Sequence, residues 1–127
     1  MMVDTDVLIW ASRGNERAVV ALARLAGFRI SVVTYAEILE GVRDREELRN
    51  IQTALRLWRV SILHISEAVS QRAMFFVEQF ALSHSVHLAD ALVAATAIHH
   101  GETLLTANVR HFSVLPGLDT RRFVPGR

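Results

Sequence analysis

The sequence has 127 residues, the usual size of one compact domain, and we expect a single domain over residues 1–127. Apolar residues make up 51% of it, with 6 glycines and 2 prolines, which excludes disordered, collagen-like and linker-rich classes. The lack of cysteine excludes disulfide frameworks, thiolate nucleophiles and cysteine zinc sites.

Two features of the chain predict a cytoplasmic location without membrane association. The longest apolar runs are far shorter than the roughly 20 residues that span a bilayer. Asp4 and Asp6 stand where a secretory peptide would carry positive charge and an apolar stretch.

All 14 residues counted as Lys or Arg are arginines, so the chain contains no lysine. Schiff-base chemistry and the lysine of a phosphate-binding P-loop are therefore excluded, whereas arginine can still bind phosphates with two hydrogen bonds. The formal net charge is only +1, so any binding of nucleic acid has to come from a local patch.

In the first half of the chain, short apolar segments alternate with helical patterns. Residues 1–4 form a brief apolar lead into an acidic turn, and residues 17–26 carry apolar side chains at helical spacing before Gly27. The β-branched residues 30–33 predict a short buried strand. Thr34 then opens a helix whose first turn fits a capping box with Glu37, and Gly41 ends it.

The second half repeats the alternation. Asp44 caps a helix that runs to about Trp58, residues 60–65 read as a strand, and Ser66 caps a helix to about residue 83. The apolar set of that last helix is wider than one core face requires, which predicts a second buried contact such as a subunit interface. A helix over 88–99 and a strand over 103–106 follow, and residues 112–127 form a tail with a turn at 116–117. The pattern predicts an α/β protein with a parallel sheet covered on both faces.

Three acidic residues fall at strand ends or helix starts. Asp4 follows the first strand, Glu37 lies in the first turn after the second, and Asp90 lies in the first turn of a late helix. These positions converge on the crevice at the carboxyl ends of a parallel sheet, where ligands bind. Three carboxylates repel one another there unless a cation lies between them, and oxygen ligands favour Mg²⁺ or Mn²⁺.

Each of these residues also has a purely structural interpretation. Asp4 and Asp6 fit ordinary helix N-caps, and the capping box accounts for Glu37 without a metal. Asp90 fits a residue that complements a helix dipole, and Asn108 fits a loop or cap position.

Four segments of the sequence form an ordered set. They are Val3-Asp4-Thr5-Asp6-Val7-Leu8-Ile9, the stretch from Ser31 to Gly41 around Thr34-Tyr35-Ala36-Glu37, the stretch from Leu88 to Ala97 that begins Leu88-Ala89-Asp90-Ala91, and Leu105-Thr106-Ala107-Asn108-Val109-Arg110-His111-Phe112. In this order they resemble the four blocks of PIN domains, most closely those of the VapC-type toxins of bacterial toxin–antitoxin pairs. The resemblance spans nearly the whole chain.

The resemblance implies a three-layer α/β/α sandwich with a central, mostly parallel sheet, and a metal-dependent endoribonuclease that forms homodimers and is inhibited by a cognate VapB-type antitoxin. By position, Asp4 and Asp90 match the metal-binding aspartates and Glu37 matches the middle acid. Thr5 and Thr106 match supporting hydroxyls. Asn108 stands where the family often has an acid, which leaves a second metal site open.

The residues suggest a mechanism that fits this resemblance. Mg²⁺ or Mn²⁺ held by Asp4 and Asp90 would polarise the scissile phosphate, while Glu37 would orient or deprotonate a water molecule or hold a second metal. Arg110, or the arginines of the helix that Asp44 caps, would bind the RNA backbone, and a single-stranded substrate is favoured.

Two other functions remain open from the sequence. The segment from Asp4 to Ile9 nearly fits the nucleophile loop of haloacid-dehalogenase-like phosphatases, but the usual lysine and late acidic pair of that class are absent. The second alternative is a non-catalytic PIN fold that only binds RNA or a partner protein. Asn108 favours this alternative, because it adds no charge to the site.

Overall fold

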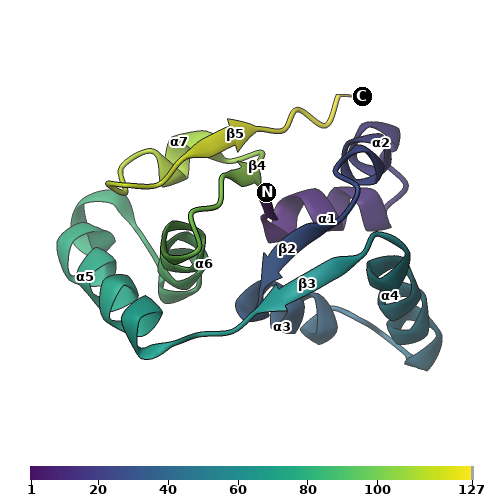
Figure 1. Cartoon of the computed structure of the whole chain (residues 1–127), viewed down its shortest axis with the longest axis horizontal. Helices are drawn as coiled ribbons and strands as arrows, with labels where there is room; N and C mark the ends of the chain where they lie inside the picture. The colour runs from purple at the N-terminus through teal and green to yellow at the C-terminus, as the bar shows by residue number, and fades with distance from the viewer. Residues whose placement is uncertain (127) are drawn as a thin grey trace.

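The computed structural model describes residues 1–126 and contains a five-stranded sheet in which every strand pair is parallel (Figure 1). The strands are β1 (Met2–Val3), β2 (Phe28–Ser31), β3 (Val60–Leu63), β4 (Leu104–Thr106) and β5 (Thr120–Arg122). Their order across the sheet is β3-β2-β1-β4-β5.

Helices cover both faces of this sheet, which confirms the expected three-layer α/β/α sandwich (Figure 1). They are α1 (Thr5–Ser12), α2 (Glu16–Arg24), α3 (Val32–Glu40), α4 (Arg45–Leu57), α5 (Glu67–His84), α6 (Leu88–His99) and α7 (Val109–Phe112). Because side chains alternate along a strand, Met2 and Leu104 pack into the core under α5 and α6, whereas Val3 and Leu105 pack into the core under α1 and α2.

The strand order contains one reversal of direction, and it lies at β1. From β1 the chain moves outward through β2 to β3, and then crosses back to place β4 on the other side of β1. In open parallel sheets, a crevice forms outside the carboxyl ends of the two strands at such a switch point. Here those ends are Val3 and Thr106, directly beside Asp4.

Most helix boundaries agree with the sequence-based expectations. Asp44 and Ser66 cap α4 and α5 through their side chains, and Gly41 is the C-cap of α3. Among residues 1–126, no helix is both long and apolar enough to cross a bilayer.

Three local expectations were wrong. Residues 32–33 belong to α3 rather than to a strand, because the Ser31 side chain accepts a hydrogen bond from Val33 N and starts the helix there. Helix α1 was not anticipated, because no element was expected between residues 5 and 16. The expected tail after residue 112 contains β5, which forms the edge of the sheet beside β4.

An ion-pair cluster holds the opposite edge of the sheet, at the amino ends of the strands. The Glu102 carboxylate lies 2.8 Å from the Met1 amino group and 3.0 Å from an Arg29 guanidinium nitrogen. These partners, the Met1 amino group above all, lower the pKa of Glu102 below its ordinary value. The cluster therefore links the ends of β1, β2 and β4.

Because the pKa of Glu102 is lower in the folded state than in the unfolded chain, its stabilising contribution is present at neutral pH and is lost as the pH falls through the folded-state pKa. Glu102→Gln is expected to lower the free energy of unfolding at about pH 7 and to approach the wild-type value near pH 3. Urea denaturation at both pH values measures this. Glu40→Gln, at the exposed end of α3, is the control. If the difference in unfolding free energy between Glu102→Gln and the wild type is the same at both pH values, the proposed ion-pair role is wrong.

Candidate active site

Asp4 lies at the switch point and links the ends of two strands. It directly follows β1 and is the N-cap of α1, where its Oδ1 accepts a hydrogen bond from Thr5 N at 2.8 Å. Its Oδ2 accepts a second hydrogen bond from the Thr106 hydroxyl, also at 2.8 Å, although the two residues are far apart in sequence. The N-cap interpretation of Asp4 is therefore correct, and the same carboxylate also faces the crevice.

Asp6 lies beside Asp4 in the first turn of α1. Its Oδ2 accepts a hydrogen bond from Ala107 N at 3.0 Å and lies 3.4 Å from the Thr106 hydroxyl. Its Oδ1 is buried and has no hydrogen-bond partner among the described residues. Sequence reasoning treated Asp6 as a possible cap and not as a site residue. The signal that could have identified it is the Asp-x-Asp spacing directly after the first strand.

The two carboxylates share an electrostatically unfavourable position. Burial is the main cause that raises the pKa of Asp4 to about 7, and the neighbouring charge of Asp6 raises it further. Burial also raises the pKa of Asp6, against the hydrogen bonds that it accepts. Two half-buried like charges and an unpaired buried oxygen are the conditions under which a bound cation lowers the free energy of the site.

Glu37 reaches the same crevice from α3. It lies in the sixth position of that helix, so the expected capping box with Thr34 is wrong. Instead, the Thr5 hydroxyl donates a hydrogen bond to Glu37 Oε1 at 2.8 Å and lies 3.0 Å from the buried Thr34 hydroxyl. Thr5 thus orients an otherwise exposed carboxylate toward Asp4 and Asp6.

Asp90 occupies the first turn of α6 on the other side of the crevice. Its Oδ2 accepts a long hydrogen bond of 3.4 Å from His87 N, which satisfies one free amide of the helix start. The same oxygen lies 3.0 Å from Nε2 of His111 on α7. Sequence reasoning assigned His111 no role, because a histidine at this spacing matches no metal-binding motif.

Asn108 and Arg110 lie on the segment that follows β4. Asn108 occupies the N-cap position of α7, but its side chain makes no capping hydrogen bond and instead lines the crevice. Its backbone N–H donates to the Thr106 hydroxyl at 3.0 Å. Arg110 is exposed on α7 and does not line the crevice, and neither do the arginines of α4.

The crevice is a cavity of about 250 Å³ at the carboxyl edge of the sheet. Its polar lining consists of Asp4, Thr5, Asp6, Glu37, Asp90 and Asn108. Carboxylate and amide oxygens are suitable ligands for a hard divalent cation, and the unpaired Oδ1 of Asp6 has no other partner. Among residues 1–126, no three acidic or histidine side chains already converge into a ligand set. The lining therefore fits an ion such as Mg²⁺, which is held by one or two carboxylates and keeps several water molecules.

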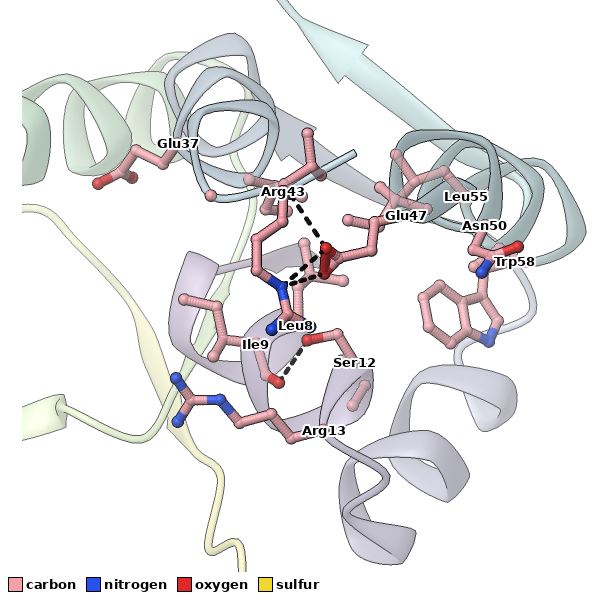
Figure 2. A pocket seen from close by; sticks show the side chains of 16 residues that line it. Leu8, Ile9, Ser12, Arg13, Glu37, Arg43, Glu47, Asn50, Leu55 and Trp58 are labelled. Atoms are coloured by element: carbon pink, nitrogen blue, oxygen red, sulfur yellow. Dashed lines mark hydrogen bonds and ion pairs between the residues drawn. The ribbon is translucent and has the colours of Figure 1, made fainter. Parts of the chain in front are cut away.

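A larger groove of about 690 Å³ adjoins this cavity and runs between α1, α3 and α4 (Figure 2). Ile9 and Glu37 line both the groove and the acidic cavity. Most of the remaining lining is apolar, including Leu8, Leu55 and Trp58. Figure 2 shows Arg43 reaching along the groove to Glu47, with its Nε 3.0 Å from Glu47 Oε2.

Comparison with known proteins assigns this fold to a family. Residues 1–118 match the model of the PIN domain, and the chain belongs to the PIN-domain family. A curated relative, ribonuclease VapC10 of Mycobacterium tuberculosis, is 35% identical over 99% of this chain and 96% of its own length. Ribonuclease VapC19 of the same organism is 32% identical over 92% of this chain and 95% of its own.

The solved structures give the same assignment. A toxin–antitoxin complex from Klebsiella pneumoniae contains a chain with a TM-score of 0.78 to this one and 26% identity, covering 99% of this chain and 98% of that one. The family match favours a PIN-domain site over the haloacid-dehalogenase-like alternative that the first segment left open.

Asp4→Asn should stabilise the metal-free protein. The folded state binds the Asp4 proton more tightly than the unfolded chain, so this carboxylate costs stability as the pH rises from about 4 through 7. Asparagine removes the charge, and its amide can still pair with Thr5 N and the Thr106 hydroxyl. We expect its Tm in EDTA at about pH 8 to exceed that of the wild type by about 3–6 °C.

The matched control for this variant is Asp119→Asn, at an exposed aspartate, which should leave Tm unchanged. Added Mn²⁺ should raise the Tm of the wild type and of the control more than that of Asp4→Asn. A lower Tm for Asp4→Asn in EDTA would show that the carboxylate stabilises the fold by itself.

Proposed function

We propose that the protein is a Mg²⁺- or Mn²⁺-dependent endoribonuclease and the toxin of a toxin–antitoxin pair, with the whole chain acting as one PIN domain. The observation that carries this proposal is the half-buried pair Asp4 and Asp6, with the unpaired, buried Oδ1 of Asp6, facing Asp90 across the switch-point cavity. The ribonuclease names of the curated relatives support the same reaction for this chain.

Each side chain of the cavity has a distinct role in this proposal. Asp4 and Asp90 hold the divalent ion, and Thr106 fixes the Asp4 carboxylate. When bound, the ion supplies positive charge that polarises the scissile phosphate and lowers the pKa of an attacking water molecule. Glu37, oriented by Thr5, accepts the proton of that water. His111 restrains Asp90 through their 3.0 Å contact.

The number of ions depends on Asp6, Glu37 and Asn108. Asn108 contributes an oxygen without charge at the position that sequence reasoning left open. Asp6 adds a carboxylate that the sequence reasoning did not assign to the site, so the negative charge of the cavity does not depend on residue 108. One tightly held ion near Asp4 and Asp90, with Asn108 orienting water or substrate, is the arrangement that we propose.

An antitoxin partner fits the large groove beside the site. Toxin–antitoxin complexes recur among the structural relatives, including the one from Klebsiella pneumoniae. The groove between α1, α3 and α4 is the larger and more apolar of the two cavities described and shares Ile9 and Glu37 with the acidic one. A peptide segment bound in it would reach the catalytic carboxylates, so we propose this groove as the antitoxin surface. We propose that the protein acts in the cytoplasm, as the sequence predicts, because RNA would be its substrate there.

The reaction is tested by incubating the purified protein with total RNA in Mg²⁺, in Mn²⁺ and in EDTA. We expect cleavage with either ion and none in EDTA. Asp4→Ala and Asp90→Ala should each reduce the cleavage rate by more than about 100-fold. Mutation of a residue that only supports a metal ligand already reduces activity by about 10–100-fold, and loss of the ligand itself should cost more.

Asp119→Ala, at an exposed aspartate outside the cavity, should cleave like the wild type. Full activity in Asp90→Ala would refute the assigned metal site. RNA binding without cleavage under all three conditions would favour the alternative of a non-catalytic PIN module, which the sequence left open.

We also propose that the protein is a homodimer formed through α5. Phe75 and Leu82 lie on one face of this helix, seven residues apart, and Leu82 is fully exposed. Leu82→Glu should convert a dimer into a monomer without loss of folding, as measured by size-exclusion chromatography with light scattering. Leu57→Glu, at an exposed leucine of α4, should leave the dimer intact. A wild-type protein that elutes with the mass of one chain would contradict this assembly.

A further inference from the structure

The exposed face of α1 carries an aromatic side chain and a cation directly beyond the acidic cavity. Asp6 lines the cavity, Trp10 follows it at i+4, and Arg13 follows Trp10 at i+3, so the three side chains share one helical face. One turn of helix, about 5.4 Å, separates each from the next. Trp10 is 37% exposed, so part of its ring is accessible to a bound molecule.

The sheet edge beside this helix face carries a second cation. In the β4–β5 ladder, Arg121 pairs with Leu105, which belongs to the core under α1. Phe123, two residues after Arg121, belongs to the same core, so the alternation of side chains places Arg121 on the α1 side of the sheet. Arg121 is exposed because β5 is the edge strand.

The side of α1 that carries Asp6 is the side that faces β4. Asp6 accepts its hydrogen bond from Ala107, directly after β4, and Trp10 lies one turn along the same face. Arg13 also lines the groove at its α1 rim, and Figure 2 shows its guanidinium extending away from α4, the helix on the far side of that groove. Trp10, Arg13 and Arg121 thus flank one surface that begins at the acidic cavity.

We propose that this surface binds the RNA strand next to the cleaved bond, with Trp10 stacking on a base and Arg13 and Arg121 contacting phosphates. This inference rests on the proposed endoribonuclease function and names the residues that bind the substrate outside the cavity. It differs from the sequence-based expectation, which placed the RNA backbone on Arg110 or on α4.

Charge and ring chemistry favour single-stranded RNA over a protein partner here. The acidic cavity repels an RNA backbone, so the substrate needs cations close to it, and beyond Asp6 the face of α1 carries no acidic residue before Arg13. An exposed tryptophan on the same side of the molecule as two arginines is the combination that holds single strands, because every base has a face on which an aromatic ring can stack.

Binding is measured in EDTA, where no cleavage occurs, by the fluorescence anisotropy of labelled oligouridylate. Trp10→Ala should weaken binding by about 5- to 100-fold, the loss expected for one stacked base, and Trp10→Phe should retain most of the affinity. Leu57→Ala, at an exposed apolar residue of α4, should change nothing. Annealing the probe to oligoadenylate should remove the contribution of Trp10, because paired bases are not free to stack.

The arginine contacts are measured by the salt dependence of the same binding. Arg121→Gln should reduce the slope of log affinity against log salt concentration by about 0.7, the value for one phosphate contact on a single strand. Arg24→Gln, at an exposed arginine in the last turn of α2, is the matched control and should retain the slope.

The chain has only two tryptophans, so stacking can also be observed directly. In Trp58→Phe, the remaining Trp10 fluorescence should be quenched by oligouridylate. In Trp10→Phe, the remaining Trp58, which packs 6.2 Å from the Phe28 ring, should not respond.

The outcomes separate this inference from the proposed function. Cleavage of total RNA by the wild type, together with unchanged binding and no quenching in the Trp10 variants, would overturn the inference alone. No cleavage, but quenching of Trp10 by RNA, would support the binding surface and refute the nuclease. If Trp10→Ala instead weakens only the association with an antitoxin co-expressed from the neighbouring gene, the surface binds protein and the inference is wrong.

Discussion

The structure depends on the partial burial of two adjacent carboxylates, Asp4 and Asp6, at the carboxyl ends of β1 and β4. Their positions are held by groups that come from the other side of the switch point, the Thr106 hydroxyl and the Ala107 amide. Burial raises the pKa of Asp4 to about 7 and leaves Oδ1 of Asp6 without a partner, so the metal-free fold carries an electrostatic cost. Such a cost is typical of sites whose geometry serves a ligand rather than stability.

The other elements hold the sheet that carries this pair and bring further polar side chains to the same cavity. The two cores hold the sheet from either face, and the Glu102 cluster links the amino ends of the strands far from the site. Around the cavity, Glu37 arrives from α3 and Asp90 from α6, each restrained by one neighbour, Thr5 or His111. The carboxylates that we propose as catalytic are therefore placed by regular elements and their caps, which position side chains more rigidly than loops do.

Three surfaces meet at this cavity, and helix α1 takes part in all of them. Its first turn carries Asp6, its flank toward α3 and α4 lines the apolar groove, and its outer face carries Trp10. Arg13 lies where that outer face meets the groove, which it also lines. In our proposals the groove takes a protein and the outer face takes RNA. A partner bound in the groove would lie within contact of Glu37, which gives a physical route from partner binding to inhibition.

The sequence by itself determined the chemistry that is available and most of the local structure. The absence of cysteine and lysine leaves carboxylates and a hard cation as the available catalytic chemistry. Capping residues such as Asp44 and Ser66 predict helix starts correctly, because a cap acts over three or four residues. The four ordered segments around Asp4, Glu37, Asp90 and Asn108 predicted the α/β sandwich and its family. Capping signals gave the wrong helix start where two of them lie close together. At residues 31–37, Ser31 caps α3, and the predicted capping box of Thr34 and Glu37 does not form.

Only the tertiary structure decided which of these residues meet. The contact between Asp4 and Thr106, the addition of Asp6 and His111 to the site, and the pairing of β5 with β4 all depend on strand order, which periodicity along the chain does not encode. The proton affinity of Asp4 likewise depends on burial by segments about a hundred residues away in sequence. A sequence can specify a carboxylate, but its pKa and its partners are properties of the packed molecule, because solvent exclusion and neighbouring charge exist only once the sheet has formed.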